Sequence, residues 1–335
     1  MKREIRLFIN KNGILTVEDP SPLEIKLLSR LGIKLKENSN STYKLPSRLS
    51  LISKKSKSFW ASKRKLFERY LKRCFLCGYK CKGKRILLGE CPMGKPSYYY
   101  QHFIHVGEEK EIGRTLVIEL VGCNIRCKFC QKGELISPKR AHLNPFTPSL
   151  WKEIKKEYKN EKIDSISFLG GNPDQSFLSI LEFLEATPKW ALNLPIVWHT
   201  NGYSTPALYN LLYGLVDILV FDFKYFNNNC AINLSKAPKY KETAKLSLKY
   251  ICEERLFPLV IVRHLVLPGH WECCQKPLID WLKKYKNNIL FNPMSQYKPM
   301  WMITERDGIL SFPIKEEEYL RVRDYALNAG LTLTE

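Results

Sequence analysis

The sequence contains no apolar run of the roughly 18 residues that a membrane-spanning helix requires. Its first seven residues, Met1 to Leu7, are rich in charge, and no apolar segment like that of a secretory signal follows them. Internal repeats and low-complexity linkers are also missing. These absences predict a cytoplasmic protein with no membrane partner. Its 335 residues suffice for one large domain with a smaller unit beside it.

Acidic residues are scarce in the first third of the chain. Residues 1–100 hold 24 Lys or Arg against 7 Asp or Glu, whereas the other 235 residues hold 30 against 26. Such a segment is typical of a surface for nucleic acid or another acidic partner, and also of a solvated lysine-rich face. Nucleic-acid binding through residues 1–70 is therefore one hypothesis.

The number of cysteines is odd, 11 in all, and no export signal accompanies them. This combination argues against a disulfide framework. Seven of the cysteines fall in two local groups, and such clustering indicates metal. The other four have no ligand spacing among themselves and are expected to be ordinary thiols: Cys230, Cys252, Cys273 and Cys274.

The pattern of apolar residues and turns divides the chain into three parts. We expect a small basic unit over residues 1–70, a loop-rich and Cys-rich segment over 71–112, and the main domain over 113–335. The small unit is predicted to contain two paired strands, a short helix and then a basic amphipathic helix, in the order Arg3–Asn10, Ile14–Val17, Leu23–Leu31 and Ser58–Arg73.

Six apolar, strand-like runs alternate with helical patterns in the main domain. The expected strands are Thr115–Val121, Ile163–Leu169, Pro195–His199, Val216–Phe221, Leu259–Leu267 and Asn288–Asn292. The expected helices are Ser149–Tyr158, Phe177–Leu184, Ala207–Leu215, Lys239–Glu254, Lys276–Tyr285 and Lys315–Asn328. This alternation predicts an α/β fold of parallel βαβ units, which right-handed crossovers curl into an open barrel or a doubly wound sheet. In both folds the chemistry gathers at the carboxyl ends of the strands.

Three cysteines, Cys123, Cys127 and Cys130, follow the first strand with the spacing C-x3-C-x2-C. Three thiolates can hold three irons of a [4Fe-4S] cluster and leave the fourth iron open to a small molecule. A zinc site completed by a distant His, or three structural thiols, is the alternative. Zinc sites usually show paired C-x2-C spacings, so the pattern favours the cluster.

With Phe129 just before its last Cys, this motif resembles that of the radical S-adenosylmethionine (SAM) superfamily, and its context resembles the pyruvate formate-lyase activating enzyme-like group. The resemblance covers residues 74 to about 299, roughly two-thirds of the chain. The segments that carry it, besides the cysteine motif, are His105–Glu109, Gly170–Pro173, Asn201–Tyr203, Val216–Ile218, Asp222–Tyr225, Arg263–Gly269 and Gln296–Pro299. The resemblance implies a partial (βα)6 barrel with a small basic N-terminal unit and a Cys-rich connecting segment.

The resemblance also implies the activity and its cofactors. SAM would bind the open iron, and an electron from the cluster would release a 5′-deoxyadenosyl radical that removes a hydrogen atom from the substrate. In the superfamily the Gly170–Gly171 turn contacts the SAM amino group, often with Glu where this chain has Asn172. The residues expected to bind the cofactor are Phe129, Gly170, Gly171, Asn172, Pro173, Asn201, Asp222, Lys224, Arg263 and His264, with His199 as a weaker candidate.

A second group of cysteines, Cys74, Cys77, Cys81 and Cys91, has four thiols within eighteen residues. Four thiols can close a structural zinc site or hold an auxiliary [4Fe-4S] cluster. The spacing favours a bound metal over free thiols. The sequence leaves open which of the two metals it is.

Three hypotheses for function follow. In the first, an activating-enzyme-like protein acts on a protein or peptide substrate, with a flavodoxin or ferredoxin as its electron donor. In the second, a radical SAM enzyme modifies RNA or another acidic molecule bound by the basic N-terminal region. The third is a non-catalytic iron–sulfur protein. The Gly-Gly turn and the polar strand ends argue against the third, because a storage cluster needs no SAM pocket.

Overall fold

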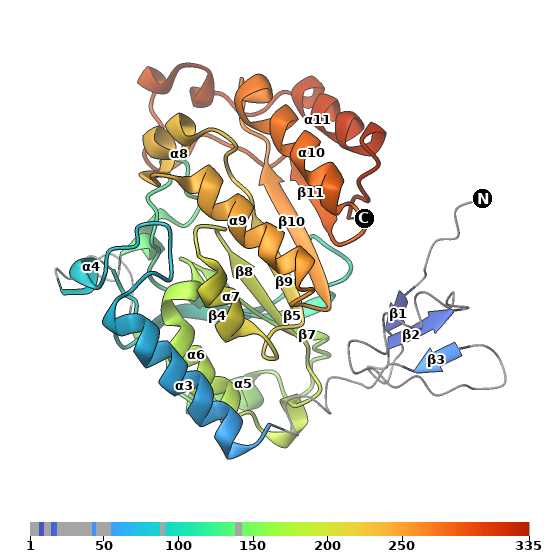
Figure 1. The fold of residues 1–335 in the computed structure, drawn as a ribbon. Helices are drawn as coiled ribbons and strands as arrows, with labels where there is room; N and C mark the ends of the chain where they lie inside the picture. Colours follow the sequence, from blue (N-terminus) through green and yellow to red (C-terminus); the bar gives the residue numbers. More distant parts are fainter. Residues whose placement is uncertain are drawn as a thin grey trace. The chain divides into compact units, whose positions relative to one another are not determined.

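The computed structural model describes residues 55–87, 91–137 and 143–334, together with the backbone of three short strands nearer the N-terminus (Figure 1). The chain divides into two compact units, residues 1–59 with 187–194 and residues 60–186 with 195–335. In the first unit an antiparallel sheet has the order β1-β2-β3 (Leu7–Ile9, Leu15–Glu18 and Thr42–Lys44). The β1–β2 pairing confirms the predicted pair of strands. The helix predicted at Leu23–Leu31 lies outside the described residues.

Among the described residues, eight strands form the main sheet in the order β11-β10-β9-β8-β7-β5-β4-β6. Six of them are parallel: β5 (Arg114–Leu120), β7 (Ser165–Gly170), β8 (Ile196–Thr200), β9 (Ile218–Asp222), β10 (Leu259–Leu265) and β11 (Leu290–Met294). Their spatial order follows the chain without reversal, whereas a doubly wound sheet reverses at a switch point. The sheet is not closed. The predicted α/β fold with a partial six-stranded barrel is therefore confirmed, and the doubly wound alternative is wrong.

Helices connect the parallel strands, and Figure 1 shows several of them covering one face of the sheet. Each predicted helix of the main domain is present, with ends within a few residues of those expected. The helices are α3 (Lys57–Lys72), α4 (Lys84–Leu87), α5 (Leu150–Glu157), α6 (Phe177–Glu185), α7 (Pro206–Leu212), α8 (Asn228–Ser235), α9 (Tyr240–Glu253), α10 (Lys276–Leu282) and α11 (Glu316–Asn328). In α6 the buried Phe177, Ile180, Leu181 and Leu184 recur every three or four residues, which gives the helix one apolar face.

The expectation that the segment 71–112 is loop-rich is wrong for its second half. Residues Tyr98–Val106 form the nine-residue strand β4, which pairs antiparallel with β5. Aromatic and β-branched residues favour this strand, but its burial does not alternate, so the period-two signal is weak. β4 also pairs with the short β6 (Asn144–Pro145), which adds two antiparallel strands to the parallel sheet.

The inside of the barrel is apolar near the amino ends of the strands. Ile112, Val197, Ile218, Val220 and Ile261 form one buried cluster there. Helix α3 packs by its aromatic residues, because Trp60 is 5% exposed and Phe67 is 1% exposed. None of the helices in the described ranges combines the length and the apolar character needed to cross a membrane.

Candidate active site

The loop of Cys123, Cys127 and Cys130 follows β5, at the carboxyl ends of the parallel strands. Cys123 and Cys127 are buried and Cys130 is half-buried. On one side the N–H of Cys123 donates to the carbonyl of Ile136 at 3.2 Å. On the other side the N–H of Arg126 donates to the carbonyl of Ser235, the last residue of α8, at 2.8 Å. The loop is thus held from both sides.

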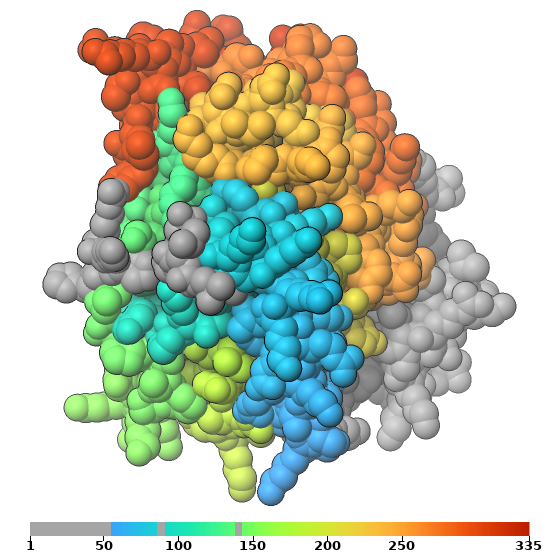
Figure 2. All heavy atoms as spheres, turned by 60° about the vertical axis from the view of Figure 1, so that its left-hand side comes forward, coloured from blue at the N-terminus to red at the C-terminus, as the bar shows by residue number. Residues whose placement is uncertain are grey.

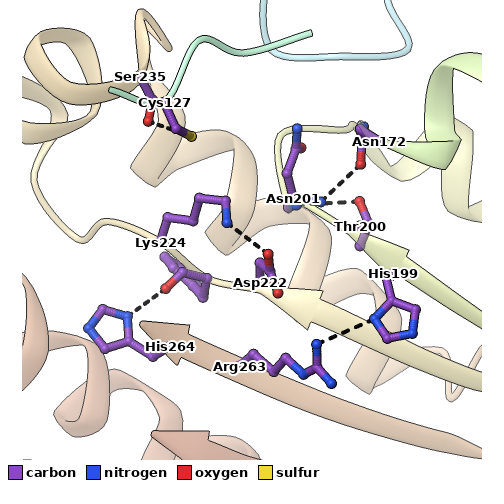
Figure 3. A network of polar contacts seen from close by, with 12 residues as sticks. Cys127, Asn172, His199, Thr200, Asn201, Asp222, Lys224, Ser235, Arg263 and His264 are labelled. Carbon is purple, nitrogen blue, oxygen red and sulfur yellow. Dashed lines mark hydrogen bonds and ion pairs between the residues drawn. The ribbon is translucent and has the colours of Figure 1, made fainter. Parts of the chain in front are cut away.

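Two of the three sulfur atoms accept hydrogen bonds from side chains that the sequence does not place near them. The hydroxyl of Ser235 donates to Sγ of Cys127 at 3.0 Å (Figure 3), and the amide of Asn201 donates to Sγ of Cys123 at 3.5 Å. Burial, reinforced by the neighbouring thiol of Cys127, raises the pKa of Cys123 to about 12 and that of Cys130 to about 11. Hydrogen bonds to ligand sulfurs orient them and tune a bound iron–sulfur cluster.

The donor chemistry of the loop fits an iron–sulfur cluster, because three thiolates can hold three irons of a [4Fe-4S] unit and leave the fourth iron open. In the described residues, the sulfurs of Cys123, Cys127 and Cys130 do not all lie within 4.8 Å of one another.

The Gly170–Gly171 turn lies directly against the cysteine loop. A Cβ on Gly171 would lie 2.2 Å from the carbonyl oxygen of Gly122, and a Cβ on Gly170 would lie 2.5 Å from that of Leu120. The N–H of Gly171 donates to Leu120 at 2.8 Å. Both glycines are required because the backbones of β5 and β7 come together here. This close packing explains why both positions are glycine, in addition to the ligand contact that the resemblance implies.

Three asparagines link this turn to the end of β8. The N–H of Asn201 donates to Oδ1 of Asn172 at 3.1 Å, and the side chain of Asn201 donates to Oδ1 of Asn124 at 2.7 Å. Asn172 is 2% exposed, and its amide N–H donates to Gln175 at 2.8 Å. Asn172 and Asn201, both predicted site residues, therefore lie in one network with the cysteine loop.

Asp222 and Lys224 lie at and just beyond the end of β9 and pair with each other at 2.7 Å (Figure 3). Burial lowers the pKa of the Lys224 ammonium, but the Asp222 carboxylate and the nearby Cys127 outweigh burial, and the pKa is raised. Lys224 is therefore a permanent cation beside the cysteine loop. About a fifth of its side chain is still exposed (18%).

Arg263, at the end of β10, binds a carboxylate of the chain itself. Its guanidinium donates to Oε1 of Glu109 at 2.6 Å and to Oε2 at 2.5 Å. The Glu109 side chain is fully buried and also accepts from Asn292 at 2.7 Å. Glu109 belongs to the turn between β4 and β5, so this cluster joins opposite ends of the open sheet. The sequence placed His105–Glu109 and Arg263 in one resemblance but gave no sign that they pair.

Two buried histidines lie next to this cluster. The Nδ1–H of His264 donates to the carbonyl of Phe223 at 2.7 Å, and burial lowers the pKa of His264 to about 4. His199 lies 3.5 Å from the Arg263 guanidinium through its Nδ1, and burial followed by the Arg263 charge lowers its pKa well below 6.5. Both imidazoles are neutral. Among the described residues, neither Nε2 atom has a hydrogen-bond partner.

A cavity of about 190 Å³ opens in the barrel below these groups. Alternate residues of β5 and β7 line it, as expected for side chains on one face of a strand. The cavity is half-open. Its larger polar lining residues are His105, Glu108, His199 and Arg263, and its other lining residues include Phe103, Thr115, Val117, Ser167 and Leu169.

Phe129 is 6% exposed, and its ring lies edge-on to that of Tyr297, with 5.9 Å between the centroids. Tyr297 belongs to the Gln296–Pro299 segment, so two parts of the resemblance meet here. Pro173 is buried and opens the short helix after the Gly-Gly turn. The structure thus brings Asn172, Asn201 and Lys224 close to the cysteine loop. Arg263 is engaged by Glu109, and His264 by the carbonyl of Phe223.

The second cysteine group lies beside the first. Residues 75–78 run along the segment after β8. There the backbones of Cys77 and Ser204 form an isolated antiparallel β-bridge, and the N–H of Gly78 donates to the carbonyl of Tyr203 at 3.1 Å. Burial raises the pKa of Cys77 to about 12, and its thiol contacts Asn124 of the cysteine loop. No three of the four thiols lie within 4.8 Å of one another, all four being described residues. Figure 2 shows this segment (cyan) between α3 (blue) and the region of α8 and α9 (gold).

Comparisons with known proteins agree with this geometry. A model of the "4Fe-4S single cluster domain" matches residues 112–239. The chain is 35% identical over 246 residues to the uncharacterized protein MJ0674 of Methanocaldococcus jannaschii, covering 71% of this chain and 70% of that protein.

Two solved structures are similar to this chain in their backbone fold. Streptococcus suis SuiB bound to S-adenosylmethionine matches with 16% identity and a TM-score of 0.45, covering 62% of this chain and 45% of SuiB. The chain thus spans less than half of SuiB. Escherichia coli QueE matches with 13% identity and a TM-score of 0.42, covering 71% of this chain and 93% of QueE.

The cysteine motif at the end of the first parallel strand lies within the residues that match the 4Fe-4S single cluster domain. The chain therefore belongs to the same family as MJ0674 of Methanocaldococcus jannaschii.

Proposed function

We propose that this protein is a radical SAM enzyme that removes a hydrogen atom from a protein or peptide substrate. The observation that carries the proposal is the convergence of the cysteine loop, the Gly170–Gly171 turn and the Asp222–Lys224 pair at one end of a barrel that contains a cavity. When bound, the cluster supplies the electron that breaks a sulfonium bond of SAM and yields the 5′-deoxyadenosyl radical.

Cys123, Cys127 and Cys130 would hold the cluster, with Asn201 and Ser235 as donors to two of the sulfurs. Lys224 would bind the carboxylate of SAM, because it is a cation fixed beside Cys127 and still partly exposed. Phe129, Gly170, Asn172 and Pro173 would line the remaining cofactor surface.

His199 and Arg263 would orient the substrate in the cavity. The neutral imidazole of His199 shares its Nδ1 with Arg263, so its Nε2–H is the donor left for a substrate group. Glu109 would act as a positioning residue through Arg263.

Burial of the aromatic residues of α3 supports a protein or peptide substrate over RNA in this region. Trp60 and Phe67 are 5% and 1% exposed, so they are not available to stack on bases. Arg64 on the same helix pairs with Glu185. We keep RNA binding by residues 1–54 as an outcome of the test.

We further propose that residues 71–112 form an auxiliary metal segment and residues 113–335 the catalytic barrel. The auxiliary site would hold a second [4Fe-4S] cluster through Cys74, Cys77, Cys81 and Cys91. Four thiols within eighteen residues suffice to hold such a cluster, with a structural zinc ion as the alternative. A flavodoxin or ferredoxin would supply the electrons.

The test is release of 5′-deoxyadenosine by the anaerobically reconstituted, dithionite-reduced protein with SAM. We expect release by the wild type, enhancement by a cellular protein fraction but not by total RNA, and none by the Cys123/Cys127/Cys130→Ala variant. The control is Cys252→Ser, a buried thiol outside both groups. Enhancement by RNA alone, lost when residues 1–54 are removed, would establish the RNA alternative. Absence of 5′-deoxyadenosine from the iron-loaded wild type would leave a non-catalytic iron–sulfur protein.

A further inference from the structure

Cys230 and Cys273 lie far apart in the sequence, and their spacing led us to expect ordinary thiols. The structure brings these two thiols together, with their sulfur atoms 3.7 Å apart. A ring nitrogen of His270 joins them, so that all three donor atoms lie within 4.8 Å of one another. Among the described residues this is the only such trio of His, Cys, Asp or Glu side chains. We propose that Cys230, Cys273 and His270 bind a zinc-class divalent cation, separate from the iron sites.

The distances fit a single ion. Zinc–thiolate bonds of about 2.3 Å in a tetrahedron place two ligand sulfurs about 3.8 Å apart, close to the distance found here. The donor set of two thiolates and one imidazole is one that borderline-soft cations such as zinc prefer.

A hydrogen bond engages one ring nitrogen of His270, which leaves Nε2 as the nitrogen that would bind the ion. The Nδ1 of His270 lies 2.8 Å from the carbonyl oxygen of Pro268, to which it donates as N–H. This hydrogen bond selects the tautomer in which Nε2 carries the lone pair. Metal-binding histidines in proteins usually donate their other ring N–H to an acceptor of this kind.

The two cysteines come from separate elements. Cys230 is the third residue of α8, whose N-cap Asn227 accepts from its N–H at 3.3 Å. Cys273 lies in the helical turn Trp271–Gln275, which runs directly into α10. Both sulfurs are therefore near helix beginnings, where the positive end of the dipole favours a thiolate.

The proposed ion would join α8 to the segment after β10, with the trio as three of its ligands. The buried thiol of Cys274, the next residue, interacts with those of Cys230 and Cys273 but is not part of the trio. Ser235, which donates to Cys127, lies five residues after Cys230 on α8, about 7.5 Å along the helix axis. The ion would thus fix a helix that holds the cysteine loop.

The test uses the full-length protein, purified anaerobically, incubated with one equivalent of ZnCl2 and desalted. Zinc and iron are then quantified by mass spectrometry. We expect Cys230→Ser, Cys273→Ser and His270→Ala each to lose about one zinc per chain relative to the wild type, with iron unchanged. Cys252→Ser, which replaces a buried thiol elsewhere in the barrel, should keep its zinc. Zinc-edge X-ray absorption should show that the lost ion has two sulfur ligands at about 2.3 Å.

A conservative variant separates metal binding from general damage to the fold. His270→Cys should retain the zinc that His270→Ala loses, because a thiolate can replace the imidazole as a ligand. Equal zinc in Cys230→Ser, Cys252→Ser and the wild type would overturn the proposal. So would recovery of a peptide pair linked by a Cys230–Cys273 disulfide from the anaerobic protein. Neither result depends on 5′-deoxyadenosine release, so failure here is distinct from failure of the proposed function.

Discussion

The buried pair of Glu109 and Arg263 gives a prediction whose size can be worked from the structure. Glu109 is fully buried, accepts two hydrogen bonds from Arg263 at 2.6 and 2.5 Å, and accepts a third from Asn292. The Glu109→Gln variant keeps the shape but leaves the guanidinium without its buried counter-charge. Loss of one partner of a buried pair costs about 3–5 kcal/mol. Glu108, 3.9 Å from Arg263, compensates in part, so we expect the lower end of this range.

The assay is thermal unfolding of the metal-free protein, followed by tryptophan fluorescence. At about 2 °C per kcal/mol for a large domain, Glu109→Gln should lower Tm by about 6 °C or more. Removing both charges in Glu109→Leu/Arg263→Met should restore part of this loss, because an apolar pair needs no desolvation of charge. The non-additivity should be at least about 1 kcal/mol.

The control is Arg64→Gln, which breaks an ion pair with Glu185 whose side chains are 31% and 35% exposed. Exposed pairs contribute about 0–1 kcal/mol, so its Tm should change by no more than about 2 °C. The reasoning would be refuted if Glu109→Gln were as stable as Arg64→Gln. It would also be refuted if Glu109→Leu/Arg263→Met lost as much stability as Glu109→Leu and Arg263→Met lose together.

Three other predictions concern the site. Gly171→Ala should lower the iron content after reconstitution, because its Cβ would lie 2.2 Å from the carbonyl oxygen of Gly122. The control Gly330→Ala, whose Cβ would have its nearest atom at 3.5 Å, should retain iron. Equal iron content in the two variants would contradict the packing argument. Lys224→Met should weaken SAM binding about 10- to 100-fold, the value of a charged hydrogen bond, without loss of iron, and an unchanged SAM dissociation constant would rule out its assigned role. The pKa of His264 is about 4 in the folded protein and ordinarily 6.5. As the pH falls, the unfolded chain therefore binds the proton before the folded protein does. The contribution of the neutral imidazole to the free energy of unfolding is complete above pH 6.5 and is lost as the pH falls towards 4. Between pH 7 and pH 4, the free energy of unfolding in urea should fall by about 3 kcal/mol more for the wild type than for His264→Asn. An equal fall with pH in the two proteins would exclude this linkage.

Local patterns in the sequence determined the fold of the main domain. Its six parallel strands are short apolar runs that alternate with amphipathic helices, and both signals are periodic within a few residues. The cysteine motif was equally local, because the three expected cluster ligands lie in eight residues and need only one loop to bring them together. For β4, mixed burial removed the alternation, and the strand could be recognised only by its pairing with β5.

Tertiary structure decided which distant residues meet. Glu109 and Arg263 are 154 positions apart, and they pair because the β4–β5 turn lies across the open barrel from β10. Cys230 and Cys273 approach because α8 and the turn before α10 follow neighbouring strands, β9 and β10. Neither contact can be read from the spacing of residues in the sequence. The sequence shows the residue types and the periodic pattern of apolar residues within each helix or strand, but not which distant elements meet. The contacts across the barrel arise only when parallel strands and their crossovers pack into one sheet.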